Sequence, residues 1–531
     1  MTTLTELHTW LQQPDHIRVV LVEVLDVKVG ASASTFYLSS IPYTSDTTNY
    51  DPVIVGGVTF NESISTDGTI SIGFGDIEIE NTNGTKDSWF THIWDKRDIL
   101  VKIGDPRWSY SQFYTLFTGQ VDSIQARDRN GINIVLVDKL QRLDVPIQIN
   151  EVAELTAAFG EGSTVSGSIR EQNKDKLIPI IFGEVFNIEG TTVSNAPTSL
   201  LYSVSLPTTI NSSGGLCKVL EVRDNGVQVN YTENLSNGTF TLSQSSYGQI
   251  TASIQGTSSD ISNPIQHSAP YIVKEILKNF GDPVSRFIES EFDSTYSEYL
   301  ASSTTYNPLL SYQMPSVFSG IRTGVYCNSG ETKLDICQTL LSSMGLHLIV
   351  SSSGKVKLVQ YNLPNTADTL PAENYITDLD IEYATLSITE RSQPKRAVRL
   401  GYCKNYTPQV SNLAGAISDN TKNLFIDEWI IQTAVSTLPN DYNLPSKEPE
   451  IEGTALISTV DAQNEASRRL KLWEIPRTVY SFTGYPHLLT LELGAHISMT
   501  FDRFGLSDTK GLVVSLSKSW ITGRVTVGVL V

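Results

Sequence analysis

The sequence has few of the residues that usually mark catalytic, metal-binding or disulfide-bonded proteins. Its four cysteines, Cys217, Cys327, Cys337 and Cys403, are scattered and form no Cys-x-x-Cys pair. This argues against a zinc site and against a disulfide framework. The seven histidines are isolated from one another, and none shows His-x-x-x-His metal spacing. We therefore expect reduced, mostly buried thiols, no metal and no cofactor.

Basic residues and long apolar runs are also scarce. The 531 residues include 38 Lys and Arg against 57 Asp and Glu, a formal charge of -19. A nucleic-acid-binding surface should be basic, so none is expected, although an acidic surface past which nucleic acid slides is compatible with this charge. No run of about 18 apolar residues occurs, so no membrane span is expected. The first residues show no secretory signal.

Motifs for catalysis are equally rare. The glycine-rich run from Gly160 to Gly167 lacks the terminal Gly-Lys-Ser/Thr of a phosphate loop and carries Glu161, so a flexible linker is expected there. No Gly-x-Ser-x-Gly nucleophile elbow occurs. A Cys403–His347 catalytic pair has no local support, but the sequence leaves it open. We predict that the protein is not an enzyme.

What the chain does contain is a faint internal repeat. The stretch Gly511-Leu-Val-Val-Ser-Leu resembles Gly119-Gln-Val-Asp-Ser-Ile, and both continue through a glycine-bearing turn, at Gly523 and Gly131, into a second strand. Alternating apolar residues around such turns predict β-hairpins. We interpret them as matching parts of two related β-domains at the two ends of the chain. Chance similarity of two amphipathic hairpins is the alternative.

The length suggests three or four domains. Abundant Thr, Ser, Val, Ile, Gly and Tyr favour sheets, so the predicted fold is mainly β with an α+β insert. A helix expected over 4–11 packs on its own domain or on a neighbour, and the first is favoured. A polar stretch over 415–450 predicts a long loop or arm. The predicted domains are 1–150 and 376–531, both β, with a linker and small β-meander domain over 151–262 and an α+β domain over 263–375.

Two rows of carboxylates occupy alternating positions in expected strands. Asp76, Glu78 and Glu80 alternate with isoleucines, and Asp378, Asp380 and Glu382 form the second row. Alternation places one face in the core and turns the carboxylates to the other. Side chains at such spacing on a flat strand splay apart, so a solvated face is expected rather than a metal site.

Several stretches together resemble the tail-tip, or baseplate hub, proteins of tailed bacteriophages. The resemblance covers most of the chain, but each motif is structural and short. The stretches are Gly75-Asp-Ile-Glu-Ile-Glu-Asn, Trp94-Asp-Lys-Arg, Gly104-Asp-Pro-Arg-Trp-Ser-Tyr, Phe117-Thr-Gly-Gln-Val-Asp, Asp138-Lys-Leu-Gln-Arg-Leu, Ile180-Ile-Phe-Gly-Glu-Val, Val222-Arg-Asp-Asn-Gly-Val, Asn237-Gly-Thr-Phe-Thr-Leu, Arg399-Leu-Gly-Tyr-Cys-Lys-Asn-Tyr-Thr, Leu493-Gly-Ala-His-Ile and Phe501-Asp-Arg-Phe-Gly-Leu.

The resemblance implies two β-barrel domains related to the tail-tube fold and a homotrimeric ring, in which six barrels face a hexameric tube. It implies a place at the tail tip of a virion assembled in the host cytoplasm. The implied neighbours are a distal tail or tail-tube ring, a tape-measure protein and a receptor-binding fibre, with genomic DNA passing through unbound. Both carboxylate rows then become candidate channel-lining groups, and an outward-facing position is the alternative for each.

Two other functions stay open on the sequence. One is a host-receptor or glycan-binding tail protein. The other is a tail-associated cell-wall hydrolase with catalytic carboxylates in the 263–375 region, because an acidic β-rich chain offers many candidate pairs.

Overall fold

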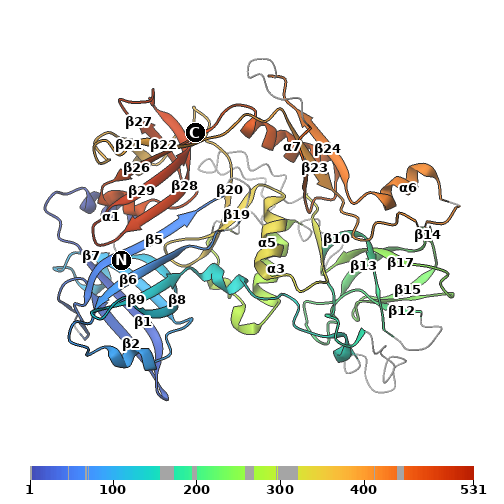
Figure 1. The fold of residues 1–531 in the computed structure, drawn as a ribbon, viewed down its shortest axis with the longest axis horizontal. Coiled ribbons are helices and arrows are strands. Elements are labelled where there is room, and N and C mark those ends of the chain that lie inside the picture. Colours follow the sequence, from blue (N-terminus) through green and yellow to red (C-terminus); the bar gives the residue numbers. More distant parts are fainter. Residues whose placement is uncertain are drawn as a thin grey trace.

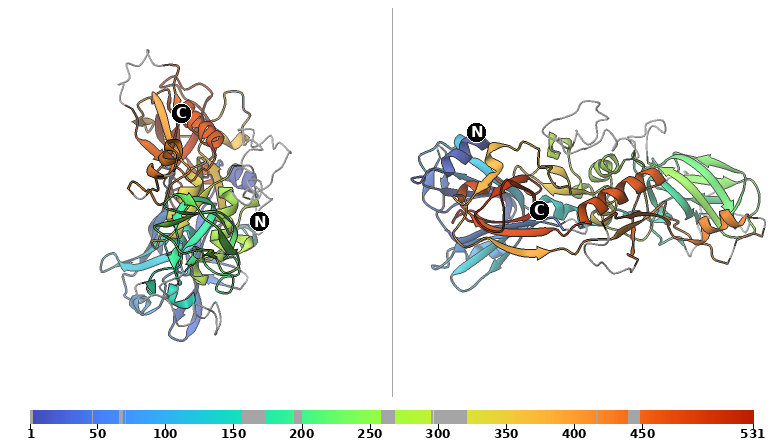
Figure 2. Two further views of the ribbon diagram at one scale, coloured as in Figure 1. Left: turned by 90° about the vertical axis from the view of Figure 1, so that its right-hand side faces the viewer. Right: turned by 90° about the horizontal axis from the view of Figure 1, so that it is seen from above.

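The computed structural model describes residues 3–45, 47–65, 69, 71–155, 173–193, 200–257, 268–294, 296, 321–411, 413–415, 417–438 and 448–531. The run at 160–167 lies outside these residues. Both chain ends lie in one half of an elongated molecule, and the central β-strands lie at the other end (Figure 1; Figure 2). The described residues form six sheets and few helices, so the mainly β fold with an α+β segment is confirmed.

The first β-domain consists of apolar strands joined by short connections. The short N-terminal helix begins at a capping box in which Thr3 and Glu6 satisfy each other's backbone N–H groups. The elements are α1 (Leu4–Leu11), β1 (Val19–Val29), β2 (Ser32–Ser39), β3 (Tyr43–Thr44), β4 (Asn49–Tyr50), β5 (Ile54–Ser63), β6 (Phe74–Glu80), η1 (Asp87–Thr91), β7 (Asp98–Gly104), η2 (Tyr110–Gln112), β8 (Tyr114–Ala126), β9 (Gly131–Val137) and η3 (Lys139–Leu143).

The central region combines small sheets with two packed helices. Its elements are η4 (Val152–Glu154), β10 (Ile180–Glu189), β11 (Thr191–Thr192), β12 (Leu201–Ser203), β13 (Leu216–Asp224), β14 (Val227–Gln228), β15 (Tyr231–Asn234), β16 (Thr239–Leu242), β17 (Ile250–Gly256), α3 (Ala269–Asn279), η7 (Pro283–Ser285), η8 (Glu289–Glu291), β18 (Gly324–Cys327), α5 (Lys333–Ser342), β19 (Leu346–Val350) and β20 (Val356–Gln360). Strands β10 to β18 form a five-stranded and a four-stranded sheet, while α3 and α5 pack together beside the β19–β20 hairpin.

The C-terminal part contains the second β-domain and a three-stranded sheet covered by a long helix. Its elements are η11 (Ala372–Asn374), β21 (Tyr375–Thr377), β22 (Ser387–Arg391), β23 (Ala397–Tyr402), α6 (Asp419–Ile426), β24 (Ile430–Val435), β25 (Ile451–Gly453), α7 (Thr459–Trp473), β26 (Thr478–Gly484), η12 (Pro486–Thr490), β27 (His496–Thr500), β28 (Thr509–Ser519) and β29 (Val525–Leu530). The prediction of a long loop over 415–450 is wrong, because α6 and β24 lie within it. β24 itself is mostly apolar (Ile-Ile-Gln-Thr-Ala-Val) and pairs with β23, and the polar residues on either side of it concealed the strand.

One 13-stranded sheet runs through both β-domains. Its main path is β2-β1-β7-β8-β9-β6-β5-β28-β29-β26-β22, and β27 and β21 branch from β28. One hydrophobic core cluster contains residues from both ends of the chain. No sheet among the described residues closes on itself, so the closed barrels implied by the resemblance are not confirmed.

The two β-domains share a strand order built around the same hairpin. In the first, the spatial order is β7-β8-β9-β6-β5, and in the second it is β27-β28-β29-β26-β22. The hairpin glycines also match in register, since Gly119 faces Ile99 and Gly511 faces Ile497. The terminal regions therefore have a common topology, as the sequence repeat predicts.

Both hairpins also carry a β-bulge at the same place. The register shifts between Val121 and Ser123 in the first hairpin and between Val513 and Ser515 in the second. After the bulge, the loop at 520–524 is one residue longer than the loop at 127–130. Gly523 accordingly has a left-handed φ of +72°, whereas Gly131 is the first residue of β9 and has no positive φ. The predicted equivalence of the two turn glycines is therefore wrong by one residue.

The paired glycines Gly119 and Gly511 are required by close backbone packing. A Cβ at Gly119 would lie 2.5 Å from the carbonyl oxygen of Val137, and a Cβ at Gly511 would lie 2.7 Å from the carbonyl oxygen of Leu530. Both distances are well inside van der Waals contact, and both obstacles are backbone atoms of the second hairpin strand. The same steric constraint thus acts twice in the chain.

Alanine at either glycine should destabilise the fold. We expect Gly119→Ala and Gly511→Ala each to lower the free energy of unfolding by about 1–3 kcal/mol, the usual cost of overpacking. Thermal unfolding midpoints measure the loss. Gly415→Ala is the control, because a Cβ there meets no described atom within 4 Å. Equal losses in all three variants would contradict the steric explanation.

Candidate functional site

The two β-domains are joined by direct pairing of their strands. β5 runs antiparallel to the second half of β28, with Ser63 opposite Ser515 and Thr59 opposite Ser519. The N–H of Trp520 donates to the Val58 carbonyl at 2.9 Å, which continues the ladder beyond β28. We call this pairing the β5–β28 joint. It makes the ends of the chain parts of one sheet.

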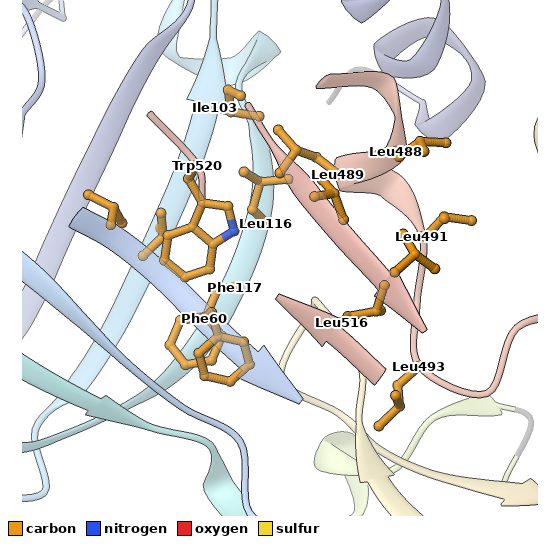
Figure 3. Packing of buried hydrophobic residues seen from close by; sticks show 14 of the residues in the cluster. Phe60, Ile103, Leu116, Phe117, Leu488, Leu489, Leu491, Leu493, Leu516 and Trp520 are labelled. Atoms are coloured by element: carbon orange, nitrogen blue, oxygen red, sulfur yellow. The ribbon is translucent and has the colours of Figure 1, made fainter. Parts of the chain in front are cut away.

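Aromatic packing fills the joint from the core side. The indole of Trp520 is 1% exposed and lies over Phe60 and Phe117, with ring centroids 6.0 and 5.6 Å away. Figure 3 shows these three rings together, with Leu116 of β8 beside Trp520, and Leu516 of β28 further away near Leu491. The cluster therefore draws on both β-domains, and burial of large aromatic side chains is a strong source of stability.

Helix α1 packs on both β-domains: the ring centroid of Trp10 lies 4.6 Å from that of Trp108 in its own domain, and the helix also contacts the second domain. It lies against η12, and the imidazole of His8 meets that of His487 edge-on at 5.2 Å. Burial lowers the pKa of His8. Arg18, just before β1, donates to the carbonyls of Ile521 and Thr522 at 3.4 and 3.0 Å in the loop between β28 and β29. The first twenty residues thus contact the second β-domain through α1 and Arg18.

A small polar cavity lies beside the joint. Its volume is about 20 Å³, enough for one water-sized molecule, and Glu62, Asp138, Glu492 and Lys518 line it. Burial holds the pKa of Glu62 above its ordinary value. Burial also raises the pKa of Asp138 to about 7, although two backbone N–H groups donate to its carboxylate. Burial therefore favours the neutral forms of both carboxyl groups.

Glu492 in the same cavity behaves differently. Burial raises the pKa of its carboxyl, but Lys357 at 3.0 Å and the nearby Lys518 outweigh burial and hold the pKa below its ordinary value. Its ion pair with Lys357 ties the second β-domain to the β19–β20 hairpin. The cavity thus links three parts of the chain.

The first carboxylate row lies on β6 as predicted, with Ile77 and Ile79 fully buried on the opposite face. Asp76 accepts hydrogen bonds from Thr59 at 2.9 Å and Asn133 at 3.3 Å. The other two carboxylates also have partners: Arg127 pairs with Glu78, and Thr82 donates to Glu80 at 2.5 Å. In the shared register, Ser481 occupies the place of Asp76, so the second β-domain carries a hydroxyl there.

The second row is not on a strand, which corrects the sequence expectation. β21 ends at Thr377, and the chain then turns before it reaches β22. Asp378 accepts from the N–H of Asp502 at 2.8 Å, Asp380 meets His487 at 3.1 Å, and Glu382 meets Arg524 at 2.7 Å. Each carboxylate therefore points to a different neighbour, and only Asp380 and Glu382 have a potentially cationic partner.

The thiols have the properties of packing residues. Burial raises the pKa of Cys337 to about 12 and that of Cys403 to about 11, whereas a reactive thiol needs a lowered pKa. In the described parts of the chain none of the four cysteines forms a disulfide. The same residues contain no group of three or more His, Cys, Asp or Glu side chains placed to hold a metal ion.

Sequence reasoning missed the joint itself. β5 and β28 lie at opposite ends of the chain, and no pattern in the sequence of either strand indicates that the other is its partner. The available signal was length, because β28 extends well past the end of its hairpin neighbour β27. The backbone N–H and C=O groups of β28 beyond its pairing with β27 need hydrogen-bond partners, which a further strand can supply.

No protein-family model matches the sequence, and no curated protein matches it. Solved structures with a similar fold are tail proteins and a chain of a virion. The 43 kDa tail protein of prophage MuSo2 from Shewanella oneidensis is 12% identical, with 97% of this chain and 98% of that chain covered and a TM-score of 0.37. A prophage tail protein from Listeria monocytogenes is 8% identical, with 97% and 94% covered and a TM-score of 0.34.

A chain of the virion of a native gene transfer agent particle is 11% identical, with 71% of this chain and 91% of that chain covered and a TM-score of 0.39. All three TM-scores lie below 0.5. Across the described parts of this chain, no helix is long and apolar enough to cross a membrane.

Removal of the central indole should open the joint. We expect Trp520→Ala to lower the free energy of unfolding by about 3–5 kcal/mol, because it leaves a cavity in a core shared by both β-domains. Denaturant titration with far-UV circular dichroism measures it. Phe504→Ala, at a ring that is 52% exposed, is the control and should change little. A small effect at Trp520 would show that the joint tolerates its loss.

Acid stability should depend on Asp380. Burial alone would raise the pKa of its carboxyl, but hydrogen bonds from His487 and Thr377 hold the pKa below the ordinary value of 3.8. A folded-state pKa below the unfolded one gives stability that is present above about pH 4 and is lost as the pH falls through the folded value. Asp380→Asn should therefore lower the thermal midpoint at pH 6 and flatten its decline below pH 4. Asp378→Asn is the matched control, and parallel curves for Asp380→Asn and the parent would contradict this role.

Proposed function

We propose that this chain is a structural, non-enzymatic protein of a bacteriophage tail and forms a trimeric hub at the distal end of the tail. The observation that carries the proposal is the duplicated β-domain. Two units of one strand order lie side by side in a continuous sheet within one chain. Three such chains supply six similar units, so a threefold ring can match a sixfold tube.

The surroundings of the described acidic groups and thiols fit a structural role. Glu62 is buried at the joint, Glu492 is ion-paired there, and burial raises the pKa of the Cys337 and Cys403 thiols. The ion pair of Glu492 with Lys357 joins two parts of the chain, as a structural role requires.

We further propose that the carboxylate rows at Asp76, Glu78, Glu80 and at Asp378, Asp380, Glu382 line the channel. An acidic bore repels DNA and lets it slide without specific binding. The first row is the stronger candidate, because Glu80 and Asp76 are bonded to neutral groups and keep their charge uncompensated. In the two rows together, three carboxylates have an ion-pair partner: Glu78 with Arg127, Asp380 with His487 and Glu382 with Arg524.

The proposed neighbours are a distal tail or tail-tube ring, a tape-measure protein in the lumen and a receptor-binding fibre below. The proposed location is the tail tip of a virion assembled in the bacterial cytoplasm. These partners follow from the resemblance of the sequence to tail-tip hubs, and the duplicated β-domain is the feature that suits a ring under a tube.

Mass and position test the hub directly. Light scattering of the purified protein should give three times the chain mass of 58.4 kDa. A low-resolution map of the assembled particle should show the chain ringing the tail axis. A chain found only at the side of the tail, on a fibre or on a capsid would overturn the proposal.

Neutralising the first row should slow DNA passage while leaving assembly intact. We expect Asp76→Asn/Glu78→Gln/Glu80→Gln particles to form normally but to release DNA several-fold more slowly on triggering, because an electrostatic barrier to DNA sticking is lost. Release of a DNA-binding dye signal measures it. The control neutralises Asp427, Glu428 and Glu448 near β24, at the other end of the molecule. Identical release in both triple variants would remove the row from the channel.

A further inference from the structure

Strand β22 holds the place in the second β-domain that β5 holds in the first. Each is the outermost strand, beyond β26 and β6 respectively. The equivalence is fixed by rows of directly opposed residues across the two sheets. In the first β-domain the row is Ser123, Val135, Asp76 and Thr59, and in the second it is Ser515, Gly528, Ser481 and Ser387.

The edge of β28 that receives β5 has an uncovered counterpart on β8. Leu516 and Lys518, which β5 covers, are 2% and 7% exposed. Their equivalents on β8 are Ile124, which is half-buried, and Ala126, which is exposed. Among the described residues, the segment of β8 from Ser123 onward pairs with β9 alone. The equivalent edge of β28 is hydrogen-bonded to β5 in the β5–β28 joint, so this edge of β8 can accept a strand in the same way.

β22 is the matching open strand. All five of its residues are exposed, and within the described chain it pairs with β26 alone. Open strand edges are templates for pairing with another chain, and natural proteins normally cover them. The chain therefore contains one formed joint, between β5 and β28. It also contains the two strands of a second joint, β22 and the end of β8, which are not paired with each other.

We infer that β22 of one chain pairs antiparallel with Ser123–Arg127 of the next chain and reproduces the β5–β28 joint between chains. The occupant of each open edge is thus a second copy of this protein. The internal joint supplies the register. Ser387 lies opposite Arg127, Ile388 opposite Ala126, Glu390 opposite Gln125 and Arg391 opposite Ile124, with Thr389 as the extra residue of the β22 bulge.

Charge supports this register. In this register Glu390 lies diagonally across from Arg127, and Arg391 lies diagonally across from Asp122. Each would join an ion pair that the chain already has, Arg127 with Glu78 and Asp122 with Lys96. Diagonal pairs are within reach of long side chains and contribute favourably. A shift by one residue would turn both side chains to the other face of the sheet.

The pairing is head-to-tail, because the two halves lie on different β-domains of each chain. Head-to-tail contacts build a ring if the rotation closes and a filament if it does not. Closure after three chains rests on the proposed function, in which six similar joints, three internal and three between chains, encircle one axis. The strand pairing itself does not require that number.

Cysteine cross-linking tests the register in the full chain. Glu390→Cys/Gln125→Cys places the two thiols on directly opposed residues, at a Cα separation that a disulfide can span. Mild oxidation with copper phenanthroline should give bands of two and three chains on a non-reducing gel. Each single variant controls for the native thiols of Cys217 and Cys403.

Glu390→Cys/Asn133→Cys is the matched control. Asn133 faces Gln125 from β9, one strand further inside the sheet. That adds about 5 Å and puts the Cα atoms beyond disulfide reach. No cross-link is expected, and equal cross-linking of both pairs would overturn the register.

A proline tests the backbone hydrogen bonds. The N–H of Ser392 donates to the Arg477 carbonyl, so alternation along the strand turns the N–H of Arg391 to the open edge. Arg391→Pro should abolish association while the thermal midpoint of the monomer stays within a few degrees, because proline is tolerated on an edge. Arg391→Ala should still associate.

The outcomes separate this inference from the hub. A trimer that forms without the Glu390–Gln125 cross-link and survives Arg391→Pro overturns the strand pairing and leaves the hub intact. A cross-linked ladder that continues beyond three chains supports the pairing and overturns threefold closure. A chain that is monomeric at every concentration and gives no cross-link in tail particles overturns both.

Discussion

Backbone pairing between β5 and β28 is the constraint on which the rest of this molecule depends. It closes a chain loop of about 450 residues, yet loop-closure entropy grows so slowly with length that a short ladder and the Trp520 cluster suffice to hold it. Without it, two open sheets would each expose an unpaired edge. With it, everything between the two β-domains is an insertion into one continuous sheet, anchored at both ends.

The two β-domains repeat backbone constraints more faithfully than side chains. They share the strand order, the bulge after Val121 or Val513, and a glycine whose Cβ would collide with a carbonyl of the next strand. Their outer faces differ, with Asp76 on one where Ser481 stands on the other. Hydrogen-bond geometry allows few solutions for the ladder, whereas a solvent-facing side chain is free to vary. In a ring built from such units, the backbone would repeat from unit to unit, while the charge on the outer faces would alternate between the two kinds of β-domain.

Burial explains why the acidic groups near the joint are structural. Glu62 and Asp138 have raised pKa values because they are removed from water. The pKa of Glu492 is lowered instead, because the charges of Lys357 and Lys518 outweigh its burial. Through Lys357, Glu492 connects the second β-domain to the β19–β20 hairpin. An acidic chain can therefore place carboxylates both inside a joint and on an exposed sheet face, and the two sets have different roles.

Local pattern in the sequence determined the fold class, the alternation that buries Ile77 and Ile79, and the kinship of the hairpins at Gly119 and Gly511, since each depends on neighbours along the chain. It did not determine which strand lies beside β28, that α1 packs on η12, that Asp378 and Asp380 lie in a turn, or that β24 is a strand. Those depend on contacts between residues far apart in sequence, where many partners are compatible with one amphipathic strand. Tertiary structure alone decided them, because a strand has two edges and its sequence encodes mainly its two faces.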